Sequence, residues 1–330
     1  MHYFVYMLFG GIYMEYRKLI SFGKSSYVVS IPKNWVFENK LKKGDLIRLD
    51  QEYGNLVLQP KINENDQPSE PKEILINVEG KSVKQLYREI IPAYIDGFES
   101  IVLKGKDIKE KAEPIKELIR GLIALETMEQ TGDRIVAKDF LNMKEISITS
   151  LIRKMDIIVR SMMVDTKKSF EEDNFDNIYS RDGDINRLTY LIFRAIKYGL
   201  KNPLVAKKLF DLEPWNLLGL WRLTANIEHI GDTVKRVAKI MREIQLSKAK
   251  QKEFVQILAQ VESTYLNMMK SYHNQDVNLA YEMSTEKEPA IRKLDDFYLE
   301  NKSAKKIGFL VNHLKQTTLT VQDIGRCIYF

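Results

Sequence analysis

The pattern of apolar residues divides the chain into a short β-rich stretch and a long helical stretch. From about residue 143 to the C-terminus, apolar residues recur at three- and four-residue steps, which is the spacing of buried helix faces. Polar breaks separate six predicted helices, at residues 146–172, 175–200, 213–244, 248–273, 277–298 and 303–330. They fall into two sets of three, residues 143–245 and 246–330, which indicates an internal duplication.

Residues 15–61 carry the opposite pattern, with short β-branched runs separated by turn residues. Four strands are predicted at residues 17–22, 27–31, 46–50 and 56–58, and Pro32 opens one helical turn after the second strand. Four strands in so few residues bury too little apolar surface for a secure core. We therefore expect a second copy of the chain to complete this module as a dimer.

A polar linker separates this module from a middle segment of alternating strands and helices. Residues 62–71 are mostly polar and include two prolines. In residues 72–142 the pattern predicts strands at 74–78, 100–103 and 133–137, and helices at 82–96 and 107–125. Ser82 and Gln85 have the spacing of a capping box at the start of the first helix. This order predicts a small α/β layer with right-handed crossovers.

The first residues are apolar, but the run from Tyr3 to Met14 is too short to span a bilayer, which takes about twenty residues. No basic segment precedes it, so we expect neither a secretory signal nor membrane insertion. The run is either an extension upstream of a natural start at Met14 or a hydrophobic arm that packs on a partner. The start of the foldable pattern at Glu15 favours the first alternative.

Composition and charge add a few limits. The chain has 330 residues, of which 44% are hydrophobic and 29% charged, so it is globular and long enough for several domains. The net charge of +6 is compatible with a nucleic acid or an acidic surface as partner. The single cysteine, Cys327, excludes an internal disulfide framework and fits a reducing cytoplasm.

No catalytic signature is present, so we predict that the chain is not an enzyme. Gly105-Lys106 lacks the earlier glycine of a phosphate-binding loop, and no Rossmann glycine triplet occurs. The histidines His229, His273 and His313 lie on different predicted helices without the spacing of a zinc motif. Their pattern favours structural or exposed histidines.

One order of motifs in residues 15–61 is specific. A strand is followed by Ile31-Pro32, a helical turn, the run from Leu41 to Asp45 and a further strand, within RKLISFGKSSYVVSIPKNWVFENKLKKGDLIRL. This order resembles the AbrB/SpoVT/MazE-type swapped-hairpin fold. Members of that fold bind DNA as dimers through basic residues of the first loop and strand, so the resemblance implies a dimeric DNA-binding domain.

Basic and hydroxyl side chains gather where that DNA-binding surface would lie. The candidate DNA-binding residues are Arg17, Lys18, Lys24, Ser25, Ser26 and Lys33. Phosphate contacts need the cations, and the two serines can donate hydrogen bonds to phosphates or base edges. The alternative is a dimerisation domain with ordinary solvated lysines, or one that binds another protein.

Two carboxylates lie beside the apolar seam of the third predicted helix. Glu228 and Asp232 are one turn apart on the same edge, where their repulsion costs about a few tenths of a kcal/mol. Lys235 or Arg236 can offset this cost by pairing with Asp232, with Glu228 solvated. Alternatively, both carboxylates bind a hard metal ion together with carboxylates of neighbouring helices. The spacing leaves both interpretations open.

The run IEHIGDTVKRVAK around this pair resembles the Glu-x-x-x-Asp signature of the PhoU family of phosphate-signalling regulators. That family has two tandem three-helix bundles, and its signature, on the third helix of each bundle, has been linked to metal clusters. The resemblance implies a divalent or iron-type metal ion at Glu228 and Asp232. In the last predicted helix, Lys315 and Leu319 stand where the second acidic pair should be, so a second cluster is not expected. An acidic run that includes Asp184 also resembles the family, although a solvated helix face is preferred there.

The combined prediction is a multidomain, mainly α chain. A small β swapped-hairpin domain (15–61) and a linker (62–71) precede a small α/β segment (72–142) and PhoU-like tandem three-helix bundles (143–330). We predict a cytoplasmic, phosphate-responsive transcriptional regulator whose dimeric head binds DNA and whose bundles sense state or bind partners. The alternatives are an adaptor of a phosphate transporter or histidine kinase that never touches DNA, and a metal-binding sensor. The expected partners are DNA, further copies of the chain, and on the adaptor alternative those transporter or signalling proteins.

Overall fold

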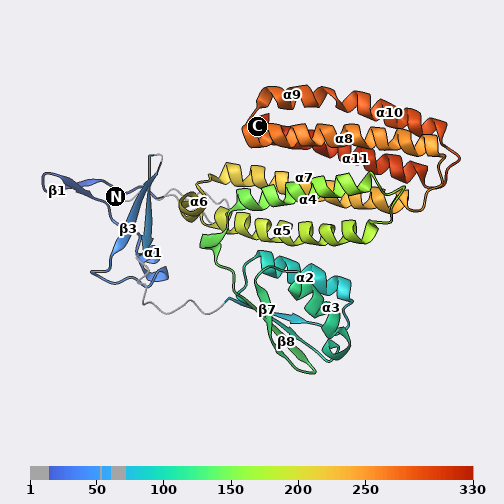
Figure 1. Cartoon of the computed structure of the whole chain (residues 1–330). Coiled ribbons are helices and arrows are strands. Elements are labelled where there is room, and N and C mark those ends of the chain that lie inside the picture. The colour runs from blue at the N-terminus through green and yellow to red at the C-terminus, as the bar shows by residue number, and fades with distance from the viewer. Residues whose placement is uncertain (1–14, 53, 61–71, 330) are drawn as a thin grey trace. The chain divides into compact units, whose positions relative to one another are not determined.

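The computed structural model describes residues 15–52, 54–60 and 72–329 (Figure 1). Contacts divide the chain into two units, Met1–Ser69 and Glu70–Phe330. The predicted N-terminal arm and the whole of the predicted linker lie outside the described residues.

The first unit contains two hairpins and one short helix. Strand β1 (Ile20–Phe22) pairs antiparallel with β2 (Ser26–Val28), and β3 (Ile47–Glu52) pairs antiparallel with β4 (Asn55–Pro60). Helix α1 (Lys33–Glu38) follows Pro32, whose fixed φ suits the entry to a helix. The turn after β1 begins at Gly23, whose φ of +68° is one that glycine adopts without strain. The four strands and the helical turn expected from the sequence are present.

This unit has no core of its own. Among its residues whose exposure is described, none is buried. Large apolar side chains are exposed on both hairpins and around α1: Tyr16, Leu19, Ile20, Phe22, Tyr27, Val28, Val29, Phe37, Leu46, Leu49 and Leu56. Burial of apolar surface is the main driving force of folding, and two hairpins without it are marginal in water.

The second unit begins with an α/β layer. Its elements are β5 (Glu73–Asn77), α2 (Val83–Ile95), β6 (Ser100–Lys104), α3 (Ile108–Arg120), β7 (Leu125–Gln130) and β8 (Arg134–Asp139). The four strands form one sheet in the order β5-β6-β8-β7, in which only β5 and β6 are parallel neighbours. The predicted capping box begins α2: Ser82 Oγ accepts from the Gln85 N–H, and Gln85 Oε1 accepts from the Ser82 N–H.

The structure corrects the sequence prediction at the end of α3. The helix was expected to reach residue 125, but it ends at Arg120, and Ala124 adopts a positive φ of +62° before the chain enters β7. Strand β7 was not predicted, because its outward positions are polar and its apolar alternation is weak. It forms a hairpin with β8, so β8 runs antiparallel to β6 and the second expected crossover does not occur.

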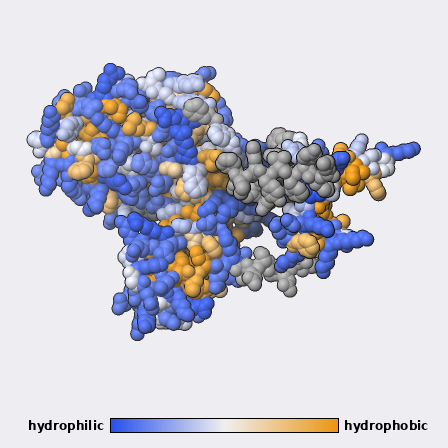
Figure 2. Space-filling view, turned by 180° about the vertical axis from the view of Figure 1, so that it is seen from behind, coloured by the Kyte–Doolittle hydropathy of each residue, from blue (hydrophilic) through white to orange (hydrophobic). Residues whose placement is uncertain are grey.

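Helices α2 and α3 cover one face of the sheet with a core that includes Ile90, Ile101 and Ile115 (Figure 1). Exposed apolar side chains remain in this layer, among them Leu75 on β5 and Met128 on β7. Figure 2 shows a hydrophobic patch on this part of the second unit.

The rest of the second unit is helical. Its helices are α4 (Ile148–Thr166), α5 (Phe175–Lys201), α6 (Pro203–Phe210), α7 (Pro214–Met241), α8 (Lys248–Asn274), α9 (Val277–Thr285), α10 (Lys287–Glu300) and α11 (Ile307–Tyr329). Helices α4, α5 and α7 form the first predicted set, and α8 to α11 form the second. The two sets meet along α7 and α11 (Figure 1).

Two differences from the predicted helices follow from prolines. The additional helix α6 begins at Pro203, a residue that suits the first turn of a helix. The fifth predicted helix is broken into α9 and α10 near Glu286. Pro289 lacks the N–H that would continue α9 by bonding to the Thr285 carbonyl.

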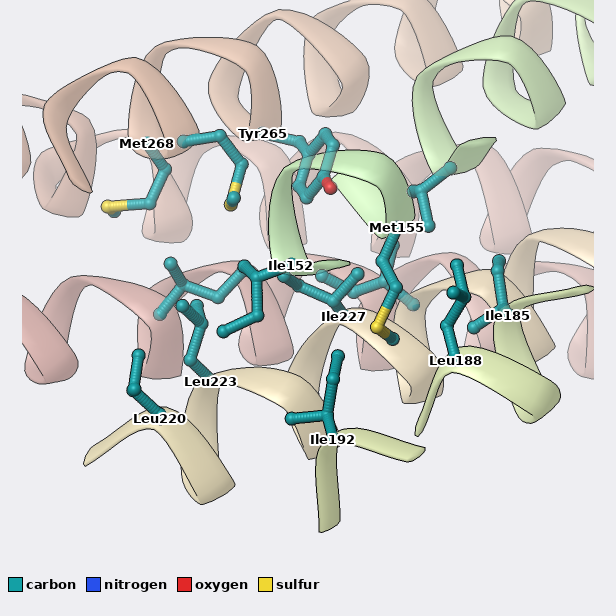
Figure 3. Packing of buried hydrophobic residues seen from close by; sticks show 14 of the residues in the cluster. Ile152, Met155, Ile185, Leu188, Ile192, Leu220, Leu223, Ile227, Tyr265 and Met268 are labelled. Carbon is teal, nitrogen blue, oxygen red and sulfur yellow. The ribbon is translucent and has the colours of Figure 1, made fainter. Parts of the chain in front are cut away.

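The two helical sets share one hydrophobic core (Figure 3). It includes Ile152, Ile192 and Ile227 of the first set and Tyr265 and Met268 of the second. A smaller cluster, with Phe254, Phe297 and Leu310 among its members, fills one part of the second set. Among the described residues, no helix is long and apolar enough to cross a membrane.

Candidate functional site

The tip of the β1–β2 hairpin carries Lys24, Ser25 and Ser26. Lys24 and Ser25 lie in the turn, and Ser26 is the first residue of β2, opposite Phe22. All three are exposed, and Lys24 forms no ion pair with another described residue. The tip thus presents an unpaired ammonium beside two hydroxyls, and such groups can donate hydrogen bonds to phosphate oxygens.

The other candidates lie at the open end of the same hairpin. The Arg17 guanidinium pairs with Glu15 at 2.5 Å and donates to Ser30 Oγ at 3.2 Å. Lys18 and Lys33 are exposed, and neither forms an ion pair within the described residues. Lys18 lies four residues before Phe22, the last residue of β1, and four residues of strand span about 13 Å. One copy therefore presents two separate basic regions, one at the tip and one at the open end of the hairpin, rather than one cluster.

Helix α7 places Glu228 and Asp232 one turn apart beside α5. Both oxygens of Asp232 are in ion pairs: Lys235 Nζ lies 2.9 Å from Oδ1, and Arg236 Nη2 lies 2.6 Å from Oδ2. The Lys235 ammonium also lies 2.7 Å from Oδ2 of Asp182 on α5. This arrangement favours the interpretation in which local cations offset the repulsion within the acidic pair.

Glu228 has a different environment. It is half-buried and forms no hydrogen bond or ion pair with another described residue. Burial raises the pKa of Glu228, and the carboxylates of Asp232 and Asp182 raise it further, whereas Lys235 and Arg236 act in the opposite direction. Protonation of Glu228 is therefore easier than that of a solvated glutamate.

Asp182 begins the acidic run on α5 that resembles the PhoU family, but it was not among the candidate metal ligands predicted from the sequence. It is buried on α5, whereas Asp184 is exposed and lies 3.9 Å from Arg187. Asp182 meets Lys235 only through the register between α5 and α7. Spacing within one helix carries no signal for such a contact.

The cluster of Asp182, Glu228 and Asp232 does not fit a metal ion as it stands. Within the described part of the chain, no group of three or more histidine, cysteine, aspartate or glutamate side chains is arranged to hold one. The Lys235 ammonium lies between Asp182 and Asp232 and supplies the positive charge instead. A metal at Glu228 and Asp232 remains a prediction, and it requires Lys235 and Arg236 to move away.

That prediction has a direct test. If Glu228 and Asp232 hold a divalent or iron-type ion, the Glu228→Ala, Asp232→Ala double variant is expected to lose the metal that the unmodified protein retains through gel filtration. Elemental analysis of both proteins measures this. If the unmodified protein contains no metal after incubation with zinc or iron, the metal prediction is wrong. The ion pairs of Asp232 with Lys235 and Arg236 would then be enough to offset the repulsion between Glu228 and Asp232.

A histidine on α11 lies near this part of α7. Burial lowers the pKa of His313; a hydrogen bond with Gln316 opposes that effect, and Arg236 and His229 add to it. Asp232 acts against the lowering as well. Because the folded state binds this proton less tightly than the unfolded state, protonation of His313 destabilises the fold.

The free energy of unfolding is therefore expected to fall as the pH decreases through about 6.5, the usual pKa of histidine in an unfolded chain. The His313→Gln variant should lose less stability than the unmodified protein between neutral and mildly acidic pH. Urea unfolding of both proteins at two pH values gives the comparison. An identical loss in both proteins would assign the pH dependence to other groups.

Two family models match the chain. The model described as MazE antitoxin, an antidote-toxin recognition protein of bacteria, matches residues 20–66, and the PhoU domain matches residues 152–241. The comparison with curated proteins found no match. Among solved structures, the chain is similar to the crystal structure of PhoU from Pseudomonas aeruginosa. The identity is 14% and the TM-score 0.34, over 55% of this chain and 90% of that chain.

The two matches include all but two of the residues discussed as DNA or metal sites. The first begins at β1 and so includes Lys24, Ser25, Ser26 and Lys33 but not Arg17 or Lys18. The second spans α4 to α7 and includes Glu228 and Asp232. Both families are regulatory and non-catalytic. The chain thus combines an N-terminal MazE/AbrB-type domain with a C-terminal PhoU domain.

Proposed function

We propose that this chain is a phosphate-responsive regulator of transcription that binds DNA through a dimeric MazE/AbrB-type head. The observation that carries the proposal is the β1–β2 hairpin with the residues beside it. They present Lys18, Lys24 and Lys33 without ion pairs to other described residues, in a domain of a DNA-binding type. Between residues 15 and 36, four basic residues face a single acidic one, Glu15. Such an excess of cations supplies the sequence-independent part of DNA affinity.

A second copy of the chain completes the head. The hairpins expose Ile20, Phe22, Tyr27, Leu49 and Leu56, which one copy leaves in water. Two interleaved copies would bury these side chains, and burial stabilises the dimer by roughly 25 cal/mol for each Å² of apolar surface removed from water. Dimerisation also doubles the number of basic regions available to a duplex, so DNA affinity depends on it.

The PhoU domain supports the link with phosphate, because PhoU proteins act in phosphate signalling. In this proposal the bundles respond to phosphate state or to a partner and alter how the two heads sit on DNA. The site of action is the cytoplasm, where DNA is accessible.

The DNA-binding part is tested by titrating a fluorescently labelled duplex with the full-length protein at increasing salt. We expect binding whose logarithmic affinity falls linearly with the logarithm of salt concentration, with a slope of about −0.9 for each phosphate contacted. A protein with six to ten contacts loses about a thousandfold or more between roughly 50 and 200 mM salt. No binding at the lowest salt would overturn this part and favour the adaptor alternative.

The phosphate part needs a separate measurement in cells. Protein crosslinked to DNA is immunoprecipitated from cells grown with and without phosphate, and the recovered DNA is sequenced. We expect discrete peaks near phosphate-transport genes that change with phosphate supply. Peaks that do not change would contradict the phosphate response while leaving DNA binding intact.

A further inference from the structure

Helices α4 and α8 lie side by side and share one solvent-facing surface. Tyr265 of α8 donates a hydrogen bond to Asp156 Oδ1 of α4 at 2.9 Å, and His273 approaches the other oxygen of Asp156 at 3.4 Å. Lys167, just after α4, pairs with the buried Glu262 of α8. These contacts show that the two helices are antiparallel, and they fix the register between them. The surface beside this seam is called the α4/α8 face here and comprises Arg153, Ile157, Val164, Lys168, Lys252 and Lys270.

The centre of the α4/α8 face is apolar. Ile157 is 60% exposed and Val164 is 44% exposed, although each is surrounded in sequence by residues that pack in the core. They are seven residues apart, so they lie on the same side of α4, about 10 Å from each other. Two β-branched side chains at this spacing form a short stripe that nothing in the described chain covers.

The two ends of the α4/α8 face are basic. Arg153 and Lys270 lie at one end, where Arg153 and His273 line the same small cavity. Lys168 and Lys252 lie at the other end, where Phe170 packs edge-on against Phe254. All four cations are exposed, and none forms an ion pair with another described residue.

The acidic residues of the same two helices do not neutralise this surface. Each of them already has a cation: Asp156 pairs with Arg160, Asp165 with Arg181, Glu253 with Lys250 and Glu262 with Lys167. Two exposed glutamates without an ion pair to another described residue, Glu171 and Glu172, lie in the turn three and four positions after Lys168. The α4/α8 face is therefore a short apolar stripe with unpaired cations at both ends, and the end with Arg153 and Lys270 is the more basic one. This is a complementary surface for an acidic and partly apolar partner.

We propose that the α4/α8 face binds an amphipathic helix of a partner protein that carries acidic residues near both ends of its apolar stripe. The separation of Arg153 and Lys168 corresponds to about 22 Å of helix, or roughly four turns. A partner helix of that length can place apolar residues seven positions apart over Ile157 and Val164 and carboxylates beside the terminal cations. An amphipathic helix that binds through apolar residues on one face is a common mode of recognition.

Two other occupants fit less well. Membrane-surface helices use bulky aromatic or leucine anchors, whereas the exposed apolar residues of the α4/α8 face are only Ile157 and Val164. A second copy of the chain offers the exposed acids of α10, but only one residue separates Arg292 and Lys293 from Asp295 and Asp296. A partner helix with acids and no such cations matches the basic ends better.

The test uses a labelled synthetic helical peptide of about four to six turns, with leucines seven residues apart and glutamates near both ends. We expect this peptide to bind the full-length protein with an affinity that falls with salt. A peptide of the same composition in scrambled order, and one with lysine in place of each glutamate, should not bind. Equal binding of all three peptides would show a non-specific contact and overturn the proposal.

Variants locate the site. Lys168→Glu with Lys270→Glu is expected to weaken peptide binding at least about tenfold, since tenfold corresponds to only 1.4 kcal/mol. The matched control reverses two exposed lysines outside the face, Lys302→Glu with Lys305→Glu, and should bind as the unmodified protein does. Retained binding by the first variant would place the peptide elsewhere on the molecule.

The apolar stripe has its own pair of variants. Ile157→Ser is expected to lower peptide affinity, whereas Leu319→Ser, a similarly exposed position on α11, should not. Binding of the protein to phosphatidylglycerol vesicles without binding to the peptide would overturn the proposal in favour of a membrane surface. The Lys18→Glu, Lys24→Glu variant should still bind the peptide, so failure of DNA binding and failure of this proposal are distinguishable.

Discussion

Lys18→Glu combined with Lys24→Glu is expected to abolish DNA binding at physiological salt. Each lysine is exposed and without an ion pair within the described residues, so its charge is free for a phosphate. In a dimer the change converts four cations into four anions. Four lost phosphate contacts lower the salt slope by about four, and the new carboxylates add repulsion from the duplex. Affinity for any duplex sequence should fall at least about a hundredfold at low salt.

The fold should survive this change, because neither lysine contributes to packing. Circular dichroism and the oligomeric state in solution are expected to match those of the unmodified protein. The control variant reverses Lys42 and Lys43, two exposed lysines in another turn of the same unit, and should retain most of the affinity. DNA binding unchanged by Lys18→Glu and Lys24→Glu would show that the β1–β2 hairpin is not the DNA-binding surface.

The sequence predicted the elements whose signal is local. Helical periodicity located the six long helical stretches, and the Ser82–Gln85 capping box marked the start of α2. Elements with weak local signals were missed: β7 has polar outward positions, and α6 is a short helix between two turns. The break in the fifth predicted helix had a visible cause in Pro289, but a proline near a helix start is also tolerated, so the pattern alone was ambiguous.

The contacts of the candidate acidic site also fall into those that local sequence spacing predicts and those that it does not. The pairing of Asp232 with Lys235 and Arg236 was foreseeable, because residues three and four positions apart meet on one helix face. The approach of Asp182 to Lys235 was not, because it depends on how α5 and α7 pack. The same holds for the α4/α8 face, where residues more than a hundred positions apart share one surface.

A buried ion pair connects the α/β layer with the helical part of the second unit. Arg194 of α5 and Asp139 of β8 form a two-pronged contact in which Nη1 lies 3.0 Å from Oδ1 and Nη2 bonds to Oδ2. Their side chains are only 5% and 8% exposed. The guanidinium also lies 4.8 Å from the centre of the Tyr94 ring, whose pKa is raised to about 12, chiefly by burial. This contact fixes α5 against the layer that precedes it.

Asp139→Ala is expected to lower the free energy of unfolding by about 3–5 kcal/mol, because it leaves Arg194 buried without a counterion. The double variant Asp139→Leu, Arg194→Met should be far less destabilised, because it removes both charges and keeps apolar volume in their place. The matched control is Asp96→Ala in the same interface, whose more exposed pairs with Lys197 and Lys201 should contribute less than about 1 kcal/mol. Urea unfolding of the full-length protein compares all four. If Asp139→Ala cost no more than Asp96→Ala, the Arg194–Asp139 pair would not hold the two layers together, and their attachment would rest on apolar packing between α2 and α5.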